Sequence, residues 1–200
     1  MLLKNVLSKR SPLLGIVKPI KIGLISPKDV FLTLVKKVDV IKALTYSPLL
    51  RDPWILDFVS IEKKPSELLK DIIPAIRYIV KGLVGEIFLE EDRELTERYE
   101  AILRALGDGN HTPKDIANYI SNFLSSPYKS QDAKKYLANL LEVGLLKRKR
   151  IYGKKKHLYY IDSPLIDLFF YLDARTGFYE VNLPVRLLLE KAKEKNAFLF

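Results

Sequence analysis

The sequence predicts a mainly α-helical fold that carries one small β-hairpin. Apolar residues recur at spacings of three and four along most of the 200 residues, as they do on the buried face of a helix. Residues 145–161 differ, because two β-capable segments there flank Tyr152, Gly153 and Lys154, a sequence typical of a hairpin turn. With 48% hydrophobic residues, the chain is long enough to bury one full core or two small ones.

The first part of the chain, residues 1–95, is expected to be a helical region after a short β-capable segment. Ser26 supplies an N-cap, Pro27 occupies the first helical position and Asp29 adds an acid to the first turn, so a helix is predicted to begin there. Apolar residues at helical spacing extend this helix to about residue 45; they are Val30, Leu34, Val38, Ile41 and Leu44.

A second helical stretch is predicted from Pro65 to about Leu95, after a proline-bounded connector at 47–53. Pro74 lies inside this stretch. Because proline lacks the amide N–H that an interior helical turn uses, we expect a bend or a break there.

Residues 96–163 show the clearest pattern, three short amphipathic helices followed by the hairpin. A glycine-rich turn at 107–110 ends the first helix, and Thr112 is the expected N-cap of the second. The third is predicted to start at a Ser130 cap and to stop at Gly144. The predicted inward residues are Tyr99, Ile102, Leu103 and Leu106 in the first helix, Ile116, Tyr119, Ile120 and Phe123 in the second, and Ala133, Tyr136, Leu137, Leu140 and Leu141 in the third.

The strands of the hairpin are predicted at Leu145–Ile151 and Lys155–Ile161. Three helices followed by a two-stranded hairpin is the element order of a winged helix-turn-helix, in which the third helix is the recognition helix and the hairpin is the wing. The predicted fold class is therefore mainly α with a small β-hairpin, comprising a helical N-terminal region plus a winged helix-turn-helix domain.

Residues 164–200 are predicted to form a C-terminal helical extension. An apolar helix is expected at Leu165–Leu172 and a last helix from Val185 to about Asn196. The sequence ends in Phe198, Leu199 and Phe200, which we expect to dock internally or against a second subunit, so a homodimer is one predicted partnership.

Positive charge is concentrated on the third helix and the hairpin. Between Lys129 and His157 ten Lys and Arg oppose two acids, which accounts for +8 of the formal net charge of +10. A basic total confined to one helix and the hairpin that follows it indicates a docking face for a polyanion. Nucleic acid is therefore the first partner that the sequence predicts.

On the winged-helix layout, outward polar and basic residues of the third helix would face the major groove and those of the hairpin would grip the backbone. The predicted DNA-binding residues are Gln131, Lys134, Lys135, Asn139, Lys147, Arg148, Lys149, Arg150, Lys154, Lys155, Lys156 and His157. Two other interpretations stay open at this point. The hairpin charges are also compatible with a solvated hairpin in a thermophile-like composition, and the helix residues with an ordinary polar face.

Several classes of function are excluded or disfavoured by composition. The chain has no Cys, which removes disulfides, thiolate zinc sites and cysteine nucleophiles, and its two His support no Ser-His-Asp arrangement. We expect no catalytic residues, cofactor or metal. No apolar run approaches the roughly 20 residues of a membrane span, and the start does not resemble a signal peptide, so a cytoplasmic protein without a membrane partner is predicted.

A family resemblance joins several of these segments. They are Ser11–Gly15, Leu24–Val30, Tyr99–Leu106, Tyr136–Leu137, Gly144–Leu146, Lys154–Lys156 and Tyr160–Asp162. In their order and spacing they resemble the C-terminal half of the archaeal ATPase family of P-loop proteins. The resemblance implies a remnant of that family's lid followed by its winged-helix domain.

The departures from that family concern its nucleotide site. The chain contains no Gly-x-x-x-x-Gly-Lys-Ser/Thr loop, and its single Gly-Lys pair, Gly153-Lys154, is followed by Lys155 rather than by a hydroxyl residue. ATP hydrolysis by this chain alone is therefore not expected, and the sequence does not predict an enzyme. The predicted function is sequence-tolerant binding of double-stranded DNA; the alternative is a protein-interaction or regulatory module for a separate P-loop ATPase chain.

Overall fold

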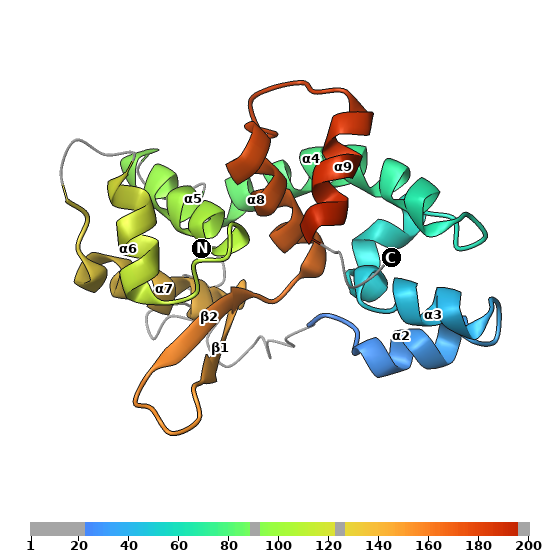
Figure 1. Ribbon diagram of the computed structural model, residues 1–200, viewed down its shortest axis with the longest axis horizontal. Coiled ribbons are helices and arrows are strands. Elements are labelled where there is room, and N and C mark those ends of the chain that lie inside the picture. The colour runs from blue at the N-terminus through green and yellow to red at the C-terminus, as the bar shows by residue number, and fades with distance from the viewer. Residues whose placement is uncertain (1–22, 89–92, 123–126, 196–200) are drawn as a thin grey trace, which may run out of the picture.

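Helices dominate the computed structural model, which describes residues 23–88, 93–122 and 127–195 (Figure 1). One two-stranded antiparallel sheet is the only sheet in these described ranges. The mainly α fold with a small β-hairpin is thus confirmed. Residues 1–22 and 196–200 lie outside the description, and with them the predicted β-capable start, the Ser11–Gly15 match and the terminal Phe198–Phe200.

The N-terminal region contains two short helices where the sequence predicted one. Helix α2 is Pro27–Leu34, with the Ser26 hydroxyl accepting the Asp29 amide at its start as expected. Helix α3 is Val40–Tyr46, and its N-cap is Asp39, whose carboxylate accepts the Lys42 amide at 2.9 Å. The prediction of one continuous helix is therefore wrong, because Asp39 satisfies the free amides of a new helix start.

The restart changes which residues of α3 face the core. Ala43 and Tyr46 are fully buried. Ile41 and Leu44, two of the apolar residues whose spacing predicted the longer helix, are 78% and 56% exposed. A pattern of three- and four-residue spacings is informative only while the helix stays in phase, and the turn before Asp39 breaks that phase.

Two 3-10 helices, η1 (Leu49–Arg51) and η2 (Pro53–Phe58), connect α3 to a long helix α4 (Pro65–Phe88). Of the two outcomes predicted at Pro74, a bend or a break, the break is wrong, because helix α4 continues through that residue. The missing N–H of Pro74 leaves the carbonyl of Lys70 without its helical donor. Both residues are solvent-exposed, so water can satisfy that carbonyl.

The middle of the chain forms three helices and the hairpin, in the predicted order. Helix α5 is Arg93–Gly107, α6 is Pro113–Ser121 and α7 is Ser130–Val143. Strand β1 is Leu146–Arg150 and pairs antiparallel with β2, His157–Ile161. The predicted inward residues are buried or half-buried, except Phe123, which lies outside the described residues.

Two C-terminal helices, α8 (Pro164–Thr176) and α9 (Val185–Lys195), complete the fold. Helix α8 extends beyond its predicted range at both ends, and α9 begins at the predicted Val185, whereas its predicted end at Asn196 lies outside the described residues. Helix α8 lies in the centre of the molecule, in contact with α4, α5 and α9 (Figure 1). Its N-cap Ser163 is buried and donates to the buried carboxylate of Asp52 at 2.8 Å, which joins the α8 start to the N-terminal region. Buried residues of all three parts of the chain therefore form one continuous core.

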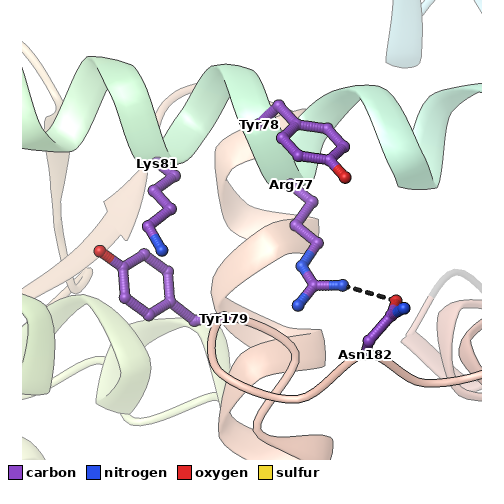
Figure 2. A pocket seen from close by; sticks show the side chains of 5 residues that line it. All are labelled: Arg77, Tyr78, Lys81, Tyr179 and Asn182. Carbon is purple, nitrogen blue, oxygen red and sulfur yellow. Dashed lines mark hydrogen bonds between the residues drawn. The ribbon is translucent and has the colours of Figure 1, made fainter.

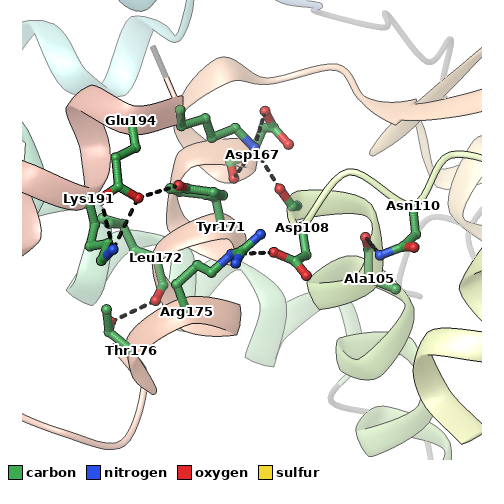
Figure 3. Close-up of polar contacts among 12 residues, drawn as sticks. Ala105, Asp108, Asn110, Asp167, Tyr171, Leu172, Arg175, Thr176, Lys191 and Glu194 are labelled. Carbon is green, nitrogen blue, oxygen red and sulfur yellow. Dashed lines mark hydrogen bonds and ion pairs between the residues drawn. The ribbon is translucent and has the colours of Figure 1, made fainter. Parts of the chain in front are cut away.

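Gly107 allows α5 and α8 to pack closely. A Cβ atom added at Gly107 would lie 2.7 Å from the carbonyl carbon of Phe170 and 2.7 Å from the amide nitrogen of Tyr171. Side chains reinforce the same junction: Arg175 of α8 lies 2.6 Å from Asp108 (Figure 3), and Lys195 of α9, which lies 2.8 Å from Asp167, donates to the Gly107 carbonyl at 2.9 Å. The end of α5 is thus fixed against α8 on both its backbone and its side chains.

Among the described helices, none combines the length and the apolar composition that a membrane crossing requires.

Candidate nucleic-acid interface

A single glycine sets the angle between α7 and the hairpin. Gly144 has φ 89°, in the left-handed region that glycine adopts without steric cost, and its amide donates to the carbonyls of Leu140 and Leu141. The amide of Leu145 then bonds to Leu140 at 3.1 Å, and β1 starts one residue later. The prediction of Gly144 as the stop signal is confirmed, and the polar face of α7 and the basic strand are joined by a tight turn.

The start of α7 is held by the turn that precedes it. The amide of Tyr128 donates to the Ser121 hydroxyl at the end of α6, at 2.8 Å. The Tyr128 ring is half-buried, and burial raises the pKa of its phenol to about 12, so it stays neutral. Ser130 is the first helical residue rather than the cap; the cap position is Lys129, which makes no side-chain capping bond.

The outward face of α7 differs from the prediction at one position. Gln131, Lys134 and Lys135 are exposed, as expected of groups that could reach a ligand. Asn139 is half-buried, and its amide nitrogen donates to the Tyr99 hydroxyl on α5 at 2.7 Å. A contact between helices therefore occupies one of the two N–H donors of the Asn139 amide, the group that base recognition would need.

Side chains of the hairpin alternate between its two faces. The pairing register places Arg148 opposite Tyr159 and Arg150 opposite His157, on the same face as the buried pair Leu146 and Ile161. Lys147 and Lys149 lie on the other face, opposite Tyr160 and Leu158. The basic residues of β1 thus point to both sides of a ribbon, while all four remain exposed.

The tip of the hairpin is longer than predicted, since Lys155 and Lys156 belong to the turn and not to the second strand. The amide of Lys154 bonds to Ile151, and Gly153 between them has φ 71°, the geometry of a type II turn. Tyr152 at this turn is completely exposed. The sequence predicted Tyr152 as a turn residue, but it is not among the predicted DNA-binding residues.

The base of the hairpin is joined to the N-terminal region by an ion-pair chain. Lys147 lies 2.8 Å from Asp162, and Arg51 lies 3.8 Å from the other oxygen of the same carboxylate. Arg51 also donates to the carbonyl of Ile25 at 3.1 Å. Asp162 therefore neutralises part of the Lys147 charge and fixes the direction in which the hairpin leaves the core.

The outer edge of β2 pairs with the link between α5 and α6. The Tyr159 amide donates to the His111 carbonyl at 2.9 Å, and the His111 ring nitrogen Nδ1 lies 2.9 Å from the Tyr159 carbonyl. His111 thus acts as a short third partner of the sheet. His157, the first residue of β2, is half-buried.

The comparisons with known proteins leave the geometry as the basis for any assignment. No family model, no curated protein and no solved structure matches this chain significantly.

The described part of the chain brings together no group of three or more His, Asp or Glu side chains that could hold a metal ion. The concentration of exposed cations on α7 and the hairpin is the feature with the clearest chemical consequence, attraction of phosphate groups.

Proposed function

We propose that residues 93–161 form a winged helix-turn-helix that binds double-stranded DNA with little sequence preference. The element order supports this proposal: α5, α6 and α7 are followed by the hairpin, and His111 between the first two helices pairs with the edge of β2. In this arrangement α7 is the recognition helix and the hairpin is the wing.

One observation carries the proposal: the basic residues of this surface lack compensating acidic residues. Ten Lys and Arg lie between Lys129 and Lys156, all of them described and exposed. Of these ten, Lys147 alone has a carboxylate within ion-pair distance in the described structure. Like charges at this density repel one another, and a phosphate backbone relieves the repulsion while it releases its own counterions.

The two-sided hairpin suits a duplex better than a flat anionic surface. A ribbon that lies along a groove has a phosphate strand on either side, so Lys149 on one face and Arg148 on the other can each meet phosphates. Lys154, Lys155 and Lys156 at the tip add charge where the hairpin extends furthest from the helices (Figure 1). Because these contacts are to the backbone, they carry no direct sequence information.

Weak sequence preference follows from the residues that α7 exposes. Lysine is a mobile point charge, and Lys134 and Lys135 therefore favour phosphates over a defined base edge. The Gln131 side chain, in the first turn, has no hydrogen-bond partner within the described residues, so its amide is available for one base contact, whereas the Asn139 amide nitrogen is bonded to Tyr99.

The experiment compares two variants that lose the same charge. Arg148, Lys149 and Arg150 are replaced by Gln in the wing variant, and the exposed Lys28, Lys36 and Lys37 are replaced by Gln in the control. Fluorescence anisotropy with two unrelated duplexes measures affinity at one fixed salt concentration. The wing variant should lose at least about tenfold on both duplexes, and the control should stay within about twofold of the wild type. Equal losses in the two variants would mean that only net charge matters and would refute the proposed interface.

A second candidate function, contact with another protein, rests on helix α3. Val40, Ile41 and Leu44 leave more than half of their side-chain surface exposed on this one short helix. The family resemblance would make a separate P-loop ATPase the partner and this chain its regulatory module. Recovery of such an ATPase by the purified chain, without any DNA binding, would favour this second function.

A further inference from the structure

A hollow of about 270 Å³ lies between helix α4 and the loop that joins α8 to α9. Its walls are Arg77, Tyr78 and Lys81 from α4 and Tyr179 and Asn182 from the loop (Figure 2). In Figure 1 this loop is at the top of the view and the hairpin is at the bottom, so the hollow is separate from the proposed DNA interface. Two cations and two aromatic rings in one hollow need an explanation.

The loop wall of the hollow is fixed by contacts behind it. Gly177 ends α8 with φ 66°, and the next residue, Phe178, is buried against the Phe169 ring at 5.6 Å. The Tyr179 amide donates to the Asp173 carboxylate at 2.7 Å. Asp173 itself pairs with Arg104 of α5. The Tyr179 ring is therefore held in place before any ligand arrives.

The two cations are positioned but not neutralised. The Arg77 guanidinium lies 5.6 Å from the Phe178 ring centroid and donates to Asn182 Oδ1 at 2.9 Å. The Lys81 ammonium lies 4.4 Å from the Tyr179 ring centroid. Within the described structure neither cation has a carboxylate at ion-pair distance. Arg77 therefore has N–H groups left to donate, and the Lys81 ammonium has three donors.

We propose that this hollow is an anion site for a small phosphate monoester, with the phosphate held between Arg77 and Lys81. A guanidinium offers a planar pair of donors that matches two phosphate oxygens, and the ammonium supplies a second charge one helical turn away. The Tyr78 ring at the rim is 76% exposed and offers an apolar surface to the organic part of the ester.

Nearby acids define which side of the hollow receives the phosphate. Burial and the charges of Glu100 and Glu180 raise the pKa of the Tyr179 phenol, so two carboxylates lie within electrostatic reach of its hydroxyl. A phosphate would be repelled there. The Tyr179 hydroxyl points away from Arg77 and Asn182 (Figure 2), so the proposed place for the phosphate is between Arg77 and the Lys81 ammonium, on the side away from that hydroxyl.

The test uses titration calorimetry of the full chain with inorganic phosphate and with adenosine monophosphate. We expect saturable binding, with the ester bound more tightly than inorganic phosphate. Lys81→Gln and Arg77→Gln should each weaken ester binding at least about tenfold, the usual loss when one charged hydrogen-bond partner is removed. Lys70→Gln is the matched control, because Lys70 is an exposed lysine of the same helix outside the hollow.

Circular dichroism of every variant establishes that the variant is folded. Each result of the titrations then decides whether the hollow binds a phosphate ester. Undetectable binding of both ligands at 10 mM, a value chosen as about the weakest useful affinity, would overturn the proposal. Equal affinity of Lys81→Gln and Lys70→Gln would also overturn it. If Lys81→Gln instead weakens DNA binding as much as the wing variant does, the hollow belongs to the DNA surface and is no separate site. Failure of the DNA proposal alone would leave ester binding unchanged.

Discussion

Replacement of Gly107 by Ala tests the packing of α5 on α8, on which the placement of the proposed DNA-binding unit depends. Gly107 has no left-handed backbone, so alanine is conformationally acceptable there and only the space decides the outcome. Its Cβ would lie 2.7 Å from two backbone atoms of α8 and 2.9 Å from the Phe170 Cβ. Relief requires a shift of roughly 1 Å between two buried helices, because carbon atoms pack at about 3.5–4.0 Å.

The expected cost follows from overpacking. Forcing one extra methyl into a tightly packed contact costs about 1–3 kcal/mol, and a clash with backbone lies at the upper end because no side chain can rotate away. The better helix propensity of alanine offsets less than about 1 kcal/mol of this near a helix end. We therefore expect the free energy of unfolding to fall by about 2 kcal/mol, with a melting temperature about 4–8 °C lower.

Urea unfolding followed by far-UV circular dichroism measures this loss. Gly82→Ala is the control, since a Cβ at Gly82, inside α4, has nothing within 4 Å. That variant should gain about 0.5–1 kcal/mol from helix propensity alone. If Gly107→Ala is stabilised as Gly82→Ala is, then α5 and α8 do not meet as described.

Two further predictions concern buried polar contacts. Burial raises the pKa of the Asp52 carboxyl above its ordinary 3.8, so the folded state binds that proton more tightly than the unfolded chain does. The unfolding free energy therefore falls as pH rises from 3.8 through the raised pKa. Asp52→Asn should remove this pH dependence of the unfolding free energy, measured by urea unfolding from pH 3.5 to 7, and an unchanged pH dependence in Asp52→Asn would contradict the raised pKa of Asp52. Asp52→Ala should lower the unfolding free energy by about 1–3 kcal/mol at pH 7, because Ser163 loses its acceptor. Asn139→Ala should lower stability by about 1 kcal/mol through the lost bond to Tyr99 while DNA affinity stays within about twofold, which thermal unfolding and anisotropy measure. A large loss of affinity without loss of stability would instead make Asn139 a DNA contact.

Local chemistry explains which elements could be predicted. The Ser26 and Thr112 caps and the Gly144 stop act within four residues of themselves, so the sequence contains all that their recognition needs. Asp39 was missed as a cap because apolar spacing across it favoured one continuous helix. Pro74 was given too much weight, since a proline on the exposed side of a long, well-packed helix need not end it.

Contacts between distant residues explain what could not be predicted. Exposure of Lys134 and Lys135 follows from helical periodicity, but the bond from Asn139 to Tyr99 joins residues 40 apart on different helices. The hollow is a stronger case, because Arg77 and Asn182 are separated by 105 residues and meet only after α8 has packed on α4. Charge runs can therefore be located from sequence, whereas pockets and the partners that occupy a side chain require the tertiary structure.

The salt dependence of DNA binding tests the central claim most directly. If five to seven of the exposed Lys and Arg side chains on α7 and the hairpin neutralise phosphates, a plot of log affinity against log salt concentration should have a slope of about −5 to −6. The variant with Arg148, Lys149 and Arg150 replaced by Gln should give a slope shallower by about 3. Affinity that does not change with salt, or a slope that is the same in this variant as in the wild type, would contradict the account.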